Sequence, residues 1–460
     1  MSDLLTSLKS ASRSLDAQRF GMDVTGQNIA NVNTPGYMRR TIDIAEVGSP
    51  DLRSGGGGAE VVGVRALRDR MLDLRLRQEL PQERRSAAMS DALSVVEASL
   101  GKPGESLDAQ MTSFFDSFAK LADNPTSAVA RQEVLLQSTA LTTSFHDIST
   151  RLTGAQRDAD QQVRSLVDQI NTIAGQISTL NASVAQATAN GNMPSVQDQQ
   201  LQLIRQLSEL ANVQVIENSN GTMDVSIGDG GRPLVIADQT YKLAVTSAGP
   251  PGLATVSAAD GSNITSELTG GRIAGYLHVR DVDVPNYQSQ LDAIAYGLTQ
   301  QVNALHSTGY DLSGAAGGNF FTPLGSAAGA ATAIAVAPTI AADATKIAAA
   351  GIAEAGDNQL ARGIAGLRDA TVLSGGTATF NDAWGTLVYT VGRDVKSAGD
   401  DQSSRAQIVQ QVDTLRDQLS GVSLDEEAAN LLKFQRAYEA NAKFFKACDD
   451  AITTLMQNLS

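Results

Sequence analysis

The last segment of the chain, residues 424–460, carries the pattern that most restricts its fold. Apolar residues recur at a strict spacing of seven, at Leu424, Leu431, Tyr438, Phe445, Ile452 and Leu459. Ala428, Ala442 and Met456 lie four residues further on in three of these repeats. A spacing of seven keeps one helix face directed at a partner only if the two helices wind around each other. We therefore predict a coiled-coil helix that requires a partner.

The beginning of the chain carries a stripe of the same kind. Counting by sevens from the first residue gives Met1, Leu8, Leu15, Met22 and Ile29. A single helix buries neither stripe, so we predict that the two ends pair with one another or with the ends of neighbouring copies. The intervening chain would then form an outward loop. The alternative is a pair of ordinary amphipathic helices packed on a globular core, which the same spacing also fits.

The N-terminal stripe ends at a turn. Pro35 and Gly36 stand at the second and third places of the tetrapeptide 34–37, where a type II turn requires a fixed φ and then a positive φ. The helix is therefore expected to stop before Thr34. Two short β-branched runs on either side of a glycine-rich stretch follow, and they predict a β-hairpin near residues 38–66.

The middle of the chain has the periodicity of long helices. Apolar residues separated by threes and fours extend over residues 141–187. They predict one helix of roughly 70 Å, a rod unlike the elements of a compact enzyme. A last helix is expected to begin near Trp384 and to be broken or kinked. Gly385, Gly392 and Gly399 recur along it and mark either a packing face or the kink.

The period changes to two at the centre of the sequence. Residues 212–271 contain short β-branched runs separated by Asn-Gly, Asp-Gly and Gly-Pro pairs, which is the pattern of antiparallel hairpins. The Gly- and Ala-rich stretch that follows residue 308 is too poor in large side chains for a core of its own. The predicted fold is therefore mainly α with an inserted antiparallel β domain (α+β).

These elements predict three nested domains, two of them discontinuous. Residues 1–34 and 424–460 form a terminal coiled-coil assembly domain. Residues 35–211 and 272–423 form a rod-like helical domain that carries the hairpin, and residues 212–271 form a small β-rich outer domain. The helical ends are thus far apart in sequence and expected side by side in space.

The charge argues against two classes of partner. The chain has 50 acidic and 35 basic residues, a formal charge of −15, and no cluster of Lys and Arg that would bind nucleic acid or an anionic membrane. No run reaches the ~20 apolar residues of a membrane span, and the N-terminus lacks the apolar core of a secretory signal. These features alone indicate a cytoplasmic protein.

Cys448 is the only cysteine, so no intrachain disulfide is possible and burial as a small apolar residue is expected.

No group of residues predicts catalysis. His146, His278 and His306 are far apart and have no second ligand at metal-binding spacing, so ordinary structural histidines are expected. Nucleophile-elbow, phosphate-loop and zinc-protease motifs do not occur in the sequence. Carboxylates alone leave a glycoside hydrolase open, but the rod-like helical pattern disfavours it. We predict a protein that is not an enzyme and that has no catalytic, metal or cofactor site.

Both ends of the chain resemble a known family. The segment NIANVNTPGY at residues 28–37 resembles the N-terminal motif of the bacterial flagellar axial proteins, which are the rod, hook and hook-associated proteins. ANLLKFQRAYEANAKF at residues 429–444 resembles their C-terminal motif. Three further stretches are similar to the hook-associated proteins of the hook–filament junction rather than to hook or rod protein. They lie at residues 123–145, 306–321 and 420–432.

The resemblance implies a structural subunit of the flagellum. Members of this family are exported unfolded by the flagellar type III apparatus, which would place this chain outside the cell at the hook–filament junction without a cleaved signal peptide. Their terminal helices are disordered in the monomer and form an inner coiled-coil layer on assembly. The implied partners are the chain itself in a helical homo-oligomer, hook protein, the second junction protein and a cytoplasmic chaperone that binds the C-terminal region.

By this resemblance the two stripes are the assembly surface. The C-terminal seam and the chaperone site are expected at Leu424, Leu431, Tyr438, Phe445, Ile452 and Leu459, and the N-terminal stripe supplies the other half. The turn out of the inner layer is expected at Asn31, Thr34, Pro35, Gly36 and Tyr37. Plain intramolecular packing is the alternative for each residue. For the whole chain the alternatives are a hook subunit or another axial protein and, less in keeping with the motifs, a secreted coiled-coil adhesin or effector.

Overall fold

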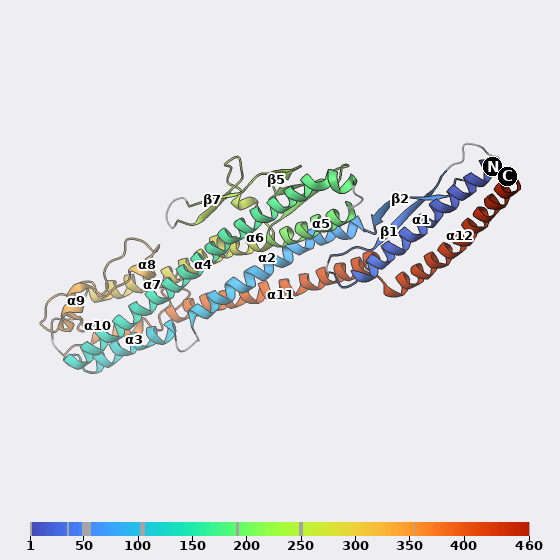
Figure 1. The fold of residues 1–460 in the computed structure, drawn as a ribbon. Coiled ribbons are helices and arrows are strands. Elements are labelled where there is room, and N and C mark those ends of the chain that lie inside the picture. Colours follow the sequence, from blue (N-terminus) through green and yellow to red (C-terminus); the bar gives the residue numbers. More distant parts are fainter. Residues whose placement is uncertain are drawn as a thin grey trace.

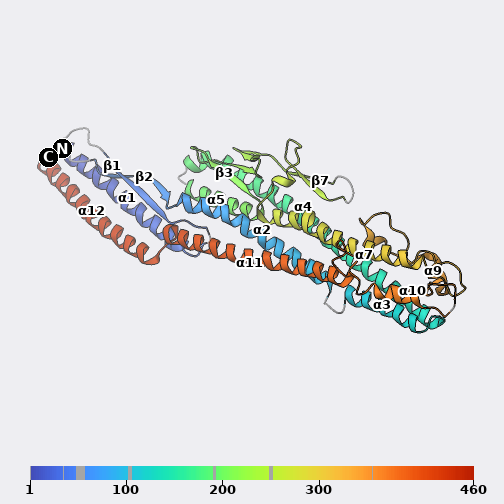
Figure 2. The same ribbon diagram turned by 180° about the vertical axis from the view of Figure 1, so that it is seen from behind.

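The fold is mainly α-helical with small antiparallel sheets, which confirms the predicted fold class, and the molecule is strongly elongated (Figures 1 and 2). The computed structural model describes residues 2–34, 36–47, 57–101, 106–189, 193–247, 252–354 and 356–459. A narrow arm at one end contains both termini. It consists of α1 (Ser2–Ala30), β1 (Arg40–Glu46), β2 (Ala59–Ala66) and α12 (Leu424–Leu459). The thicker remainder, residues 70–420, is the body.

The body is a bundle of long helices with short ones at the end far from the arm (Figure 1). The longer helices are α2 (Arg70–Leu100), α3 (Leu107–Asp123), α4 (Ala128–Ala189), α5 (Met193–Leu210), α6 (Gly271–His278), α7 (Val284–His306) and α11 (Phe380–Ser420). The short helices are α8 (Ala330–Ala333), α9 (Pro338–Ala342) and α10 (Gln359–Gly366). Two 3₁₀ turns, η1 (Thr265–Glu267) and η3 (Ala344–Lys346), and one π-helical turn, η2 (Val279–Asp283), complete the described helical elements.

The strands form three antiparallel sheets in the described parts of the chain. On the arm β1 pairs with β2. In the body, β3 (Val213–Glu217), β4 (Met223–Ile227), β5 (Arg232–Ile236) and β6 (Gln239–Thr240) form one sheet in sequence order, and β7 (Ala244–Ser247) pairs with β8 (Ala254–Ser257). The inward side chains of these strands share a core with α4, α5 and α6. The β-rich centre therefore packs on the helical bundle and does not enclose a separate core.

The principal core lies in the part of the body far from the arm. The ring of Phe320 meets Phe114, Phe118 and Phe321 edge to face, at centroid distances of 6.0, 5.4 and 4.9 Å, a favoured geometry for aromatic pairs. Phe320 and Phe321 come from the Gly- and Ala-rich stretch. That stretch thus contributes its few large side chains to the core of the helices, in keeping with the expectation that it has none of its own.

Helix α4 is longer than the apolar spacing predicts. It begins at Ala128 rather than near residue 141, and its 62 residues give a length of about 93 Å at ~1.5 Å per residue. Ser127 supports the start, because its Oγ accepts the Ala130 N–H at 3.2 Å. The buried Arg131 interrupts the apolar pattern in this first part of the helix. Its guanidinium donates to the carbonyl oxygens of Ile347 and Pro125, which stabilises a charge where the pattern requires an apolar residue.

Helix α11 is continuous over all its 41 residues, so the predicted break is wrong. Gly392 and Gly399 face α2, and a Cβ atom built at these two positions would reach α2 side chains at 3.5 and 3.7 Å. Among the described residues, none comes within 4 Å of a Cβ built at Gly385. Two of the three glycines therefore mark a face that packs closely against α2, and none interrupts the helix.

His306 is the buried histidine of the body. Its side chain is inaccessible to solvent, its Nδ1–H donates to Gly318 O at 2.7 Å, and its Nε2 accepts the Ala348 N–H at 2.8 Å. The second contact assigns the proton to Nδ1. Burial lowers the pKa of His306 to about 4, and the nearby positive charge of Arg131 also lowers it. His306 thus joins two loops of the body as a neutral imidazole, as expected of a structural histidine.

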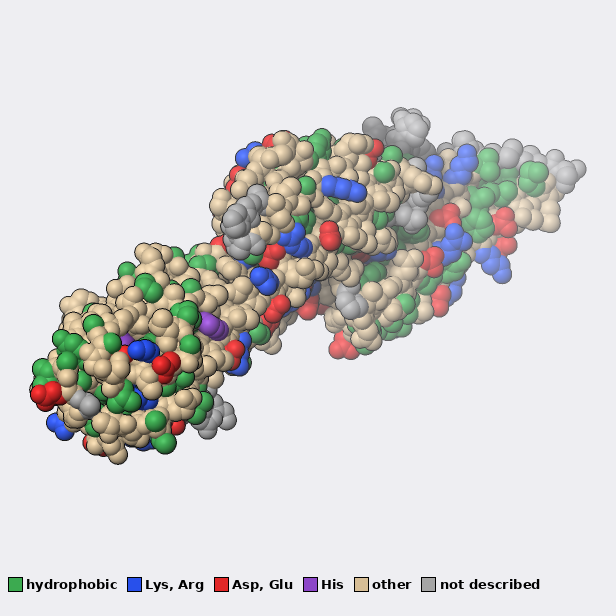
Figure 3. Space-filling view, turned by 90° about the vertical axis from the view of Figure 1, so that its left-hand side faces the viewer, with side chains coloured by type: hydrophobic (Ala, Val, Ile, Leu, Met, Phe, Trp, Pro, Cys, Tyr) green, Lys and Arg blue, Asp and Glu red, His purple; other side chains and the backbone are tan. Residues whose placement is uncertain are grey.

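The surface of the body offers no large basic patch on the face seen in Figure 3, where Lys, Arg, Asp and Glu side chains lie scattered. Within the described residues, no three His, Cys, Asp or Glu side chains are grouped as metal ligands. No helix in the described ranges is long and apolar enough to cross a membrane.

Candidate assembly arm and elbow

The arm is built from the two ends of the chain. Helices α1 and α12 lie side by side and antiparallel, with both termini at the tip of the arm (Figures 1 and 2). The hairpin of β1 and β2 packs on another side of α1. Each terminal helix therefore has the other as its partner within one chain.

One of the two seam columns of α12 lies where the sequence places it. Leu431, Phe445 and Ile452 are half-buried against α1, whereas Tyr438 is 37% and Leu424 53% exposed. The side chain of Leu459 lies outside the described part of the chain. The second column follows at three residues rather than four, and consists of Glu427, Phe434, Asn441 and Cys448. Ala428 and Met456 of the expected column are exposed.

The face of α1 against α12 is lined by small and polar residues. Its fully buried members include Ala11, Gly21, Thr25 and Asn28. The predicted stripe lies on the flank of this face and is only half-buried at Leu8, Leu15, Met22 and Ile29, while Met1 lies outside the described residues. Small residues allow the large side chains of α12 to approach the α1 backbone, so this helix contacts its partner without an apolar stripe.

Helices α1 and α12 approach each other closely at Gly21 and Phe434. A Cβ atom built at Gly21 would lie 2.7 Å from Phe434 Cε1 and 2.8 Å from Cδ1 and Cζ. These distances are far shorter than ordinary carbon–carbon contacts. The ring of Phe434 therefore occupies the space that any other residue at position 21 requires, as a knob fills a hole in a coiled coil.

Gly21→Ala is expected to destabilise the arm by about 1–3 kcal/mol, because the added methyl group overpacks the seam. Thermal unfolding followed by far-UV circular dichroism measures the change. Gly26→Ala is the matched control on the same helix, since no described atom lies within 4 Å of its Cβ position, and it should gain about 0.5–1 kcal/mol from helix propensity. Phe434→Leu should partly rescue Gly21→Ala. Equal effects of the two alanine variants would contradict the contact.

The chain leaves α1 through the predicted turn. Tyr37 N–H donates to Thr34 O at 3.2 Å and Gly36 has a φ of +81°, which are the hydrogen bond and the third-place φ of a type II turn. Asn31 Nδ2 donates to Gln27 O at 2.8 Å, and Thr34 Oγ1 donates to Asn31 Oδ1 at 3.2 Å. Pro35 lies outside the described residues. Asn31 and Thr34 thus hold the end of the helix and the turn together locally.

Asn28 is the centre of the elbow, the region where residues 28–40 meet residues 420–427. Its side chain is 1% exposed and makes four hydrogen bonds. Nδ2 donates to Arg40 O at 2.8 Å and to Glu427 Oε2 at 3.0 Å, and Oδ1 accepts Tyr37 O–H at 2.9 Å and Arg40 N–H at 3.0 Å. An amide side chain has two donors and two lone pairs, so Asn28 is fully satisfied.

Arg39 joins the two sides of the elbow. Its Nε donates to Glu427 Oε1 at 2.7 Å, its Nη1 donates to Glu426, and its backbone N–H donates to Ser420 O at 3.0 Å. The side chain of Glu427 is 2% exposed, whereas that of Glu426 is 60% exposed. Glu427 is therefore a buried charge compensated by one arginine and one asparagine of the N-terminal segment.

Arg40 connects the elbow to the body. Its Nη2 lies 3.1 Å from Asp198 Oδ2 on α5, and its guanidinium lies over the Tyr37 ring at 4.9 Å. Burial raises the pKa of Asp198, while the positive charge of Arg40 opposes the rise. Burial also raises the pKa of Tyr37, Arg40 opposes this, and the charges of Asp198 and Glu427 add to it. The arm is thus attached to α5 by a desolvated ion pair.

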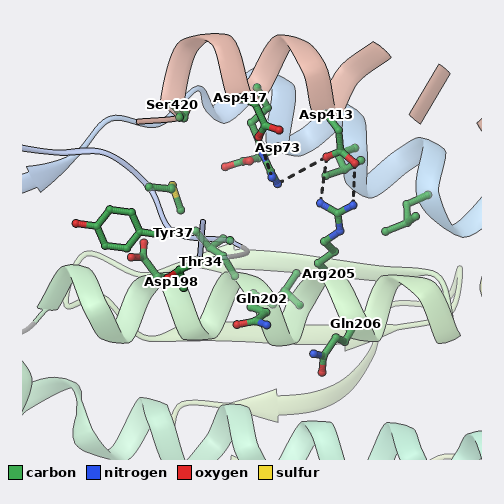
Figure 4. A pocket seen from close by; sticks show the side chains of 18 of the residues that line it. Thr34, Tyr37, Asp73, Asp198, Gln202, Arg205, Gln206, Asp413, Asp417 and Ser420 are labelled. Carbon is green, nitrogen blue, oxygen red and sulfur yellow. Dashed lines mark hydrogen bonds and ion pairs between the residues drawn. The ribbon is translucent and has the colours of Figure 1, made fainter. Parts of the chain in front are cut away.

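A cavity of about 730 Å³ lies beside the elbow, between the turn, α2, α5 and α11 (Figure 4). Tyr37 and Asp198 line one end of it. Further along, the guanidinium of Arg205 on α5 binds both carboxylate oxygens of Asp413 on α11, at 3.0 and 2.7 Å. Such bidentate pairs fix relative orientation. The cavity is therefore bordered by contacts that hold the base of the arm in place.

The comparisons with known proteins identify the family. A family model described as the flagellar hook-associated protein FlgK helical domain matches residues 93–321. Flagellar hook-associated protein 1 of Escherichia coli (strain K12) is 25% identical, with 98% of this chain and 99% of that protein aligned. The protein of the same name from Bacillus subtilis (strain 168) is 26% identical, with 100% and 99% aligned. The chain belongs to the FlgK family of flagellar hook-associated proteins.

Membership of the FlgK family confirms the resemblance found in the sequence. The chain is a structural component of the flagellum and not an enzyme. The solved structure of the flagellar hook junction protein FlgK from Burkholderia pseudomallei has the same fold, with a TM-score of 0.67 at 17% identity over 76% of this chain and 100% of that one. Two further family models match the ends of this FlgK-family chain. Flagella basal body rod protein matches residues 8–37, and Flagellar basal body rod FlgEFG protein C-terminal matches residues 416–458.

Four elbow residues of this FlgK-family chain are missing from the predicted site. They are Asn28, Arg39, Arg40 and Glu427. A search for apolar stripes passes over them, because each is polar or charged. One signal was present, since the N-terminal motif begins at Asn28 and ends at Tyr37, and these two side chains are hydrogen-bonded to each other.

Proposed function

We propose that this chain forms the hook–filament junction of the bacterial flagellum and assembles through its terminal helices. The observation that carries the proposal is that α12 remains apolar on its outside after pairing with α1. Leu432, Phe444 and Met456 are 54, 50 and 59% exposed, and hydrophobic side chains are visible along the arm in Figure 3. Exposed apolar patches on an otherwise charged helix mark interaction surfaces.

The flanks of the seam indicate how copies would associate. At 100° per residue, Met456 lies on one side of the face that contacts α1 and Phe444 on the other, while Leu432 lies on the far side of the helix. One α1 helix cannot cover a band of this width. Two flanks on opposite sides of a helix suit contacts with two neighbours, which supports a helical homo-oligomer in which the arms form the inner layer.

The proposed partners follow from the same surface. Besides further copies of itself, the chain would contact hook protein on one side and the second junction protein on the other. Before export a cytoplasmic chaperone would bind the C-terminal region, because α12 presents apolar side chains that need a cover in solution. The acidic charge of −15 supports the absence of nucleic-acid and membrane partners. We place the protein in the flagellum outside the cell, exported by the flagellar type III apparatus.

The proposed domain boundaries change in one respect. Residues 1–34 and 424–460 remain the assembly domain, and residues 212–271 remain the outer β-rich part. The hairpin near residues 38–66 packs on α1, so we now assign it to the arm and not to the helical domain of residues 35–211 and 272–423.

Phe444→Asp is expected to abolish junction assembly while leaving the free chain folded. The side chain is 50% exposed, so a charge there costs the monomer roughly 0.5 kcal/mol or less but is buried without a partner on assembly. A strain carrying the variant should have hooks that lack filaments in electron micrographs, and the purified chain should keep its melting temperature.

Two further variants test this interpretation. Val129→Asp on α4 is the matched control, because Val129 is 80% exposed on the body, and filaments should form normally. Phe445→Asp lies in the seam against α1 and should loosen the arm as well as prevent assembly. Normal filaments with Phe444→Asp would rule out the outer flank as the assembly surface.

Another axial protein, such as the hook subunit, is the second candidate. It is favoured by the rod-protein models that match both ends of the chain. Immunogold labelling separates the two, since a junction protein is confined to the base of the filament and a hook subunit extends along the whole hook. Release of the protein without any role in motility would favour the secreted adhesin instead.

A further inference from the structure

The seam of the arm contains a polar cluster where a coiled coil ordinarily has apolar residues. Asn28 is 1% and Glu427 2% exposed, and they are hydrogen-bonded across the two helices. A buried asparagine in a helix seam lowers stability but selects register and partner, because it is satisfied in only one arrangement. We propose that Asn28 and Glu427 are specificity-determining residues that restrict α12 to antiparallel pairing with α1 in a single register.

Two contacts between α1 and α12 define the register of the arm. Asn28 faces Glu427, and seven residues away Gly21 faces Phe434. A shift of one heptad removes both contacts at once. Asn28 would face the Phe434 ring, and Glu427 would face no residue of α1 that can donate a hydrogen bond as Asn28 does. A buried carboxylate and a buried amide without partners make the shifted pairing unfavourable.

The same cluster discriminates between partner helices. Two α12 helices side by side would bury a pair of Glu427 carboxylates, which repel one another. Two α1 helices would bury Asn28 without the carboxylate that accepts its N–H group. Arg39 adds to the selection, because it approaches Glu427 only from the segment that follows α1.

Cys448 is the only cysteine of the sequence, so disulfide formation with an introduced cysteine can measure the register of the two helices. Continuing the register by two further heptads, from Gly21 to Ser7 and from Phe434 to Cys448, places these residues opposite one another, and Cys448 is 7% exposed in the seam. In the Ser7→Cys chain, mild oxidation is expected to give an intrachain disulfide, seen as a faster band on a non-reducing gel. Slipped or exchanged pairing gives interchain dimers or no disulfide.

The decisive variant replaces both members of the cluster. Asn28→Leu alone leaves Glu427 buried with one partner fewer and can unfold the arm. Asn28→Leu combined with Glu427→Leu leaves neither member of the pair buried alone. It also removes the Asn28 contacts to Tyr37 and Arg40 and the Glu427 contact to Arg39, so far-UV circular dichroism must show that the helices stay folded. In the Ser7→Cys background this double variant is expected to lower the ratio of intrachain product to interchain dimer by roughly tenfold, the effect of losing one satisfied hydrogen bond to a charged group.

Asn31→Leu in the same Ser7→Cys background is the matched control. It removes an asparagine whose amide forms hydrogen bonds only within its own segment, and it should leave the ratio of intrachain product to interchain dimer unchanged. An unchanged ratio in the double variant, with helicity retained, would overturn the proposal. A Ser7→Cys chain that forms no intrachain disulfide would overturn the proposal as well. The experiment uses the free chain, so its outcome is independent of whether the protein forms the hook–filament junction.

Discussion

Glu427→Ala is expected to destabilise the arm by about 3–5 kcal/mol, the usual cost of removing one member of a buried ion pair. The side chain is 2% exposed and compensates Arg39 and Asn28. Without the Glu427 carboxylate, one N–H group of the Asn28 side chain has no acceptor. The Arg39 guanidinium then keeps only Glu426, its exposed partner. We expect the effect to be confined to the arm, because the hydrogen bonds of Glu427 within the described residues go to Asn28, Arg39 and Ser423 and none goes to the body.

Hydrogen exchange measured by mass spectrometry detects the change locally. Amides of α1 and α12 should exchange faster by roughly two to almost four orders of magnitude, as about 3–5 kcal/mol requires, while α4 and α7 keep their protection. Glu426→Ala is the matched control. It removes the neighbouring carboxylate on the same arginine, but that carboxylate is 60% exposed, so the expected cost is below ~1 kcal/mol. If Glu427→Ala and Glu426→Ala lowered the stability of the arm by similar amounts, burial would not be what determines the strength of the Arg39 ion pairs.

Acidification is expected to destabilise the body through His306. The pKa of this buried imidazole falls from 6.5 to about 4 on folding, so the unfolded chain binds a proton at a higher pH than the folded chain. The contribution is fully present above pH 6.5 and declines as the pH falls toward 4. The total loss is about 3 kcal/mol, at about 1.4 kcal/mol for each unit of pKa.

Urea unfolding between pH 7.5 and 4 measures this loss. His306→Gln removes the titrating group and keeps an amide that can donate and accept, so its stability should fall less steeply over the same range. Carboxylates that titrate there affect both proteins equally and cancel in the comparison. Parallel curves for the two proteins would mean that His306 takes up a proton as easily in the folded as in the unfolded chain.

The long elements were predictable from the sequence, because they follow from local spacing. The heptads from Leu431 to Ile452 predicted α12 and one column of its seam. The second column was missed for a physical reason. It is formed by Glu427, Asn441 and Cys448 beside Phe434, and three of these four are not large apolar residues, so a count of hydrophobic positions selects the wrong neighbours.

The partner face of α1 was missed for the opposite reason. Gly21 has no side chain that could appear in an apolar stripe, yet this lack of a side chain allows Phe434 to approach closely. Asn28 is not one of the apolar positions that spacing selects, and its burial depends on Glu427, which is 399 residues away in the sequence. Contacts of this range arise from the whole fold, and no local pattern specifies them.

The antiparallel pairing of the two chain ends also determines the order in which the molecule can fold. Bringing residues 399 positions apart together in an open chain costs about 5 kcal/mol of loop entropy. Once α2 and α11 have packed, with Val412 against Leu76 and Leu80, the elbow ends of the chain are already neighbours and most of this cost has been met. We therefore expect the body to fold first and the arm to close last, so a chain emerging N-terminus first would keep α1 without its partner until its final residues are free.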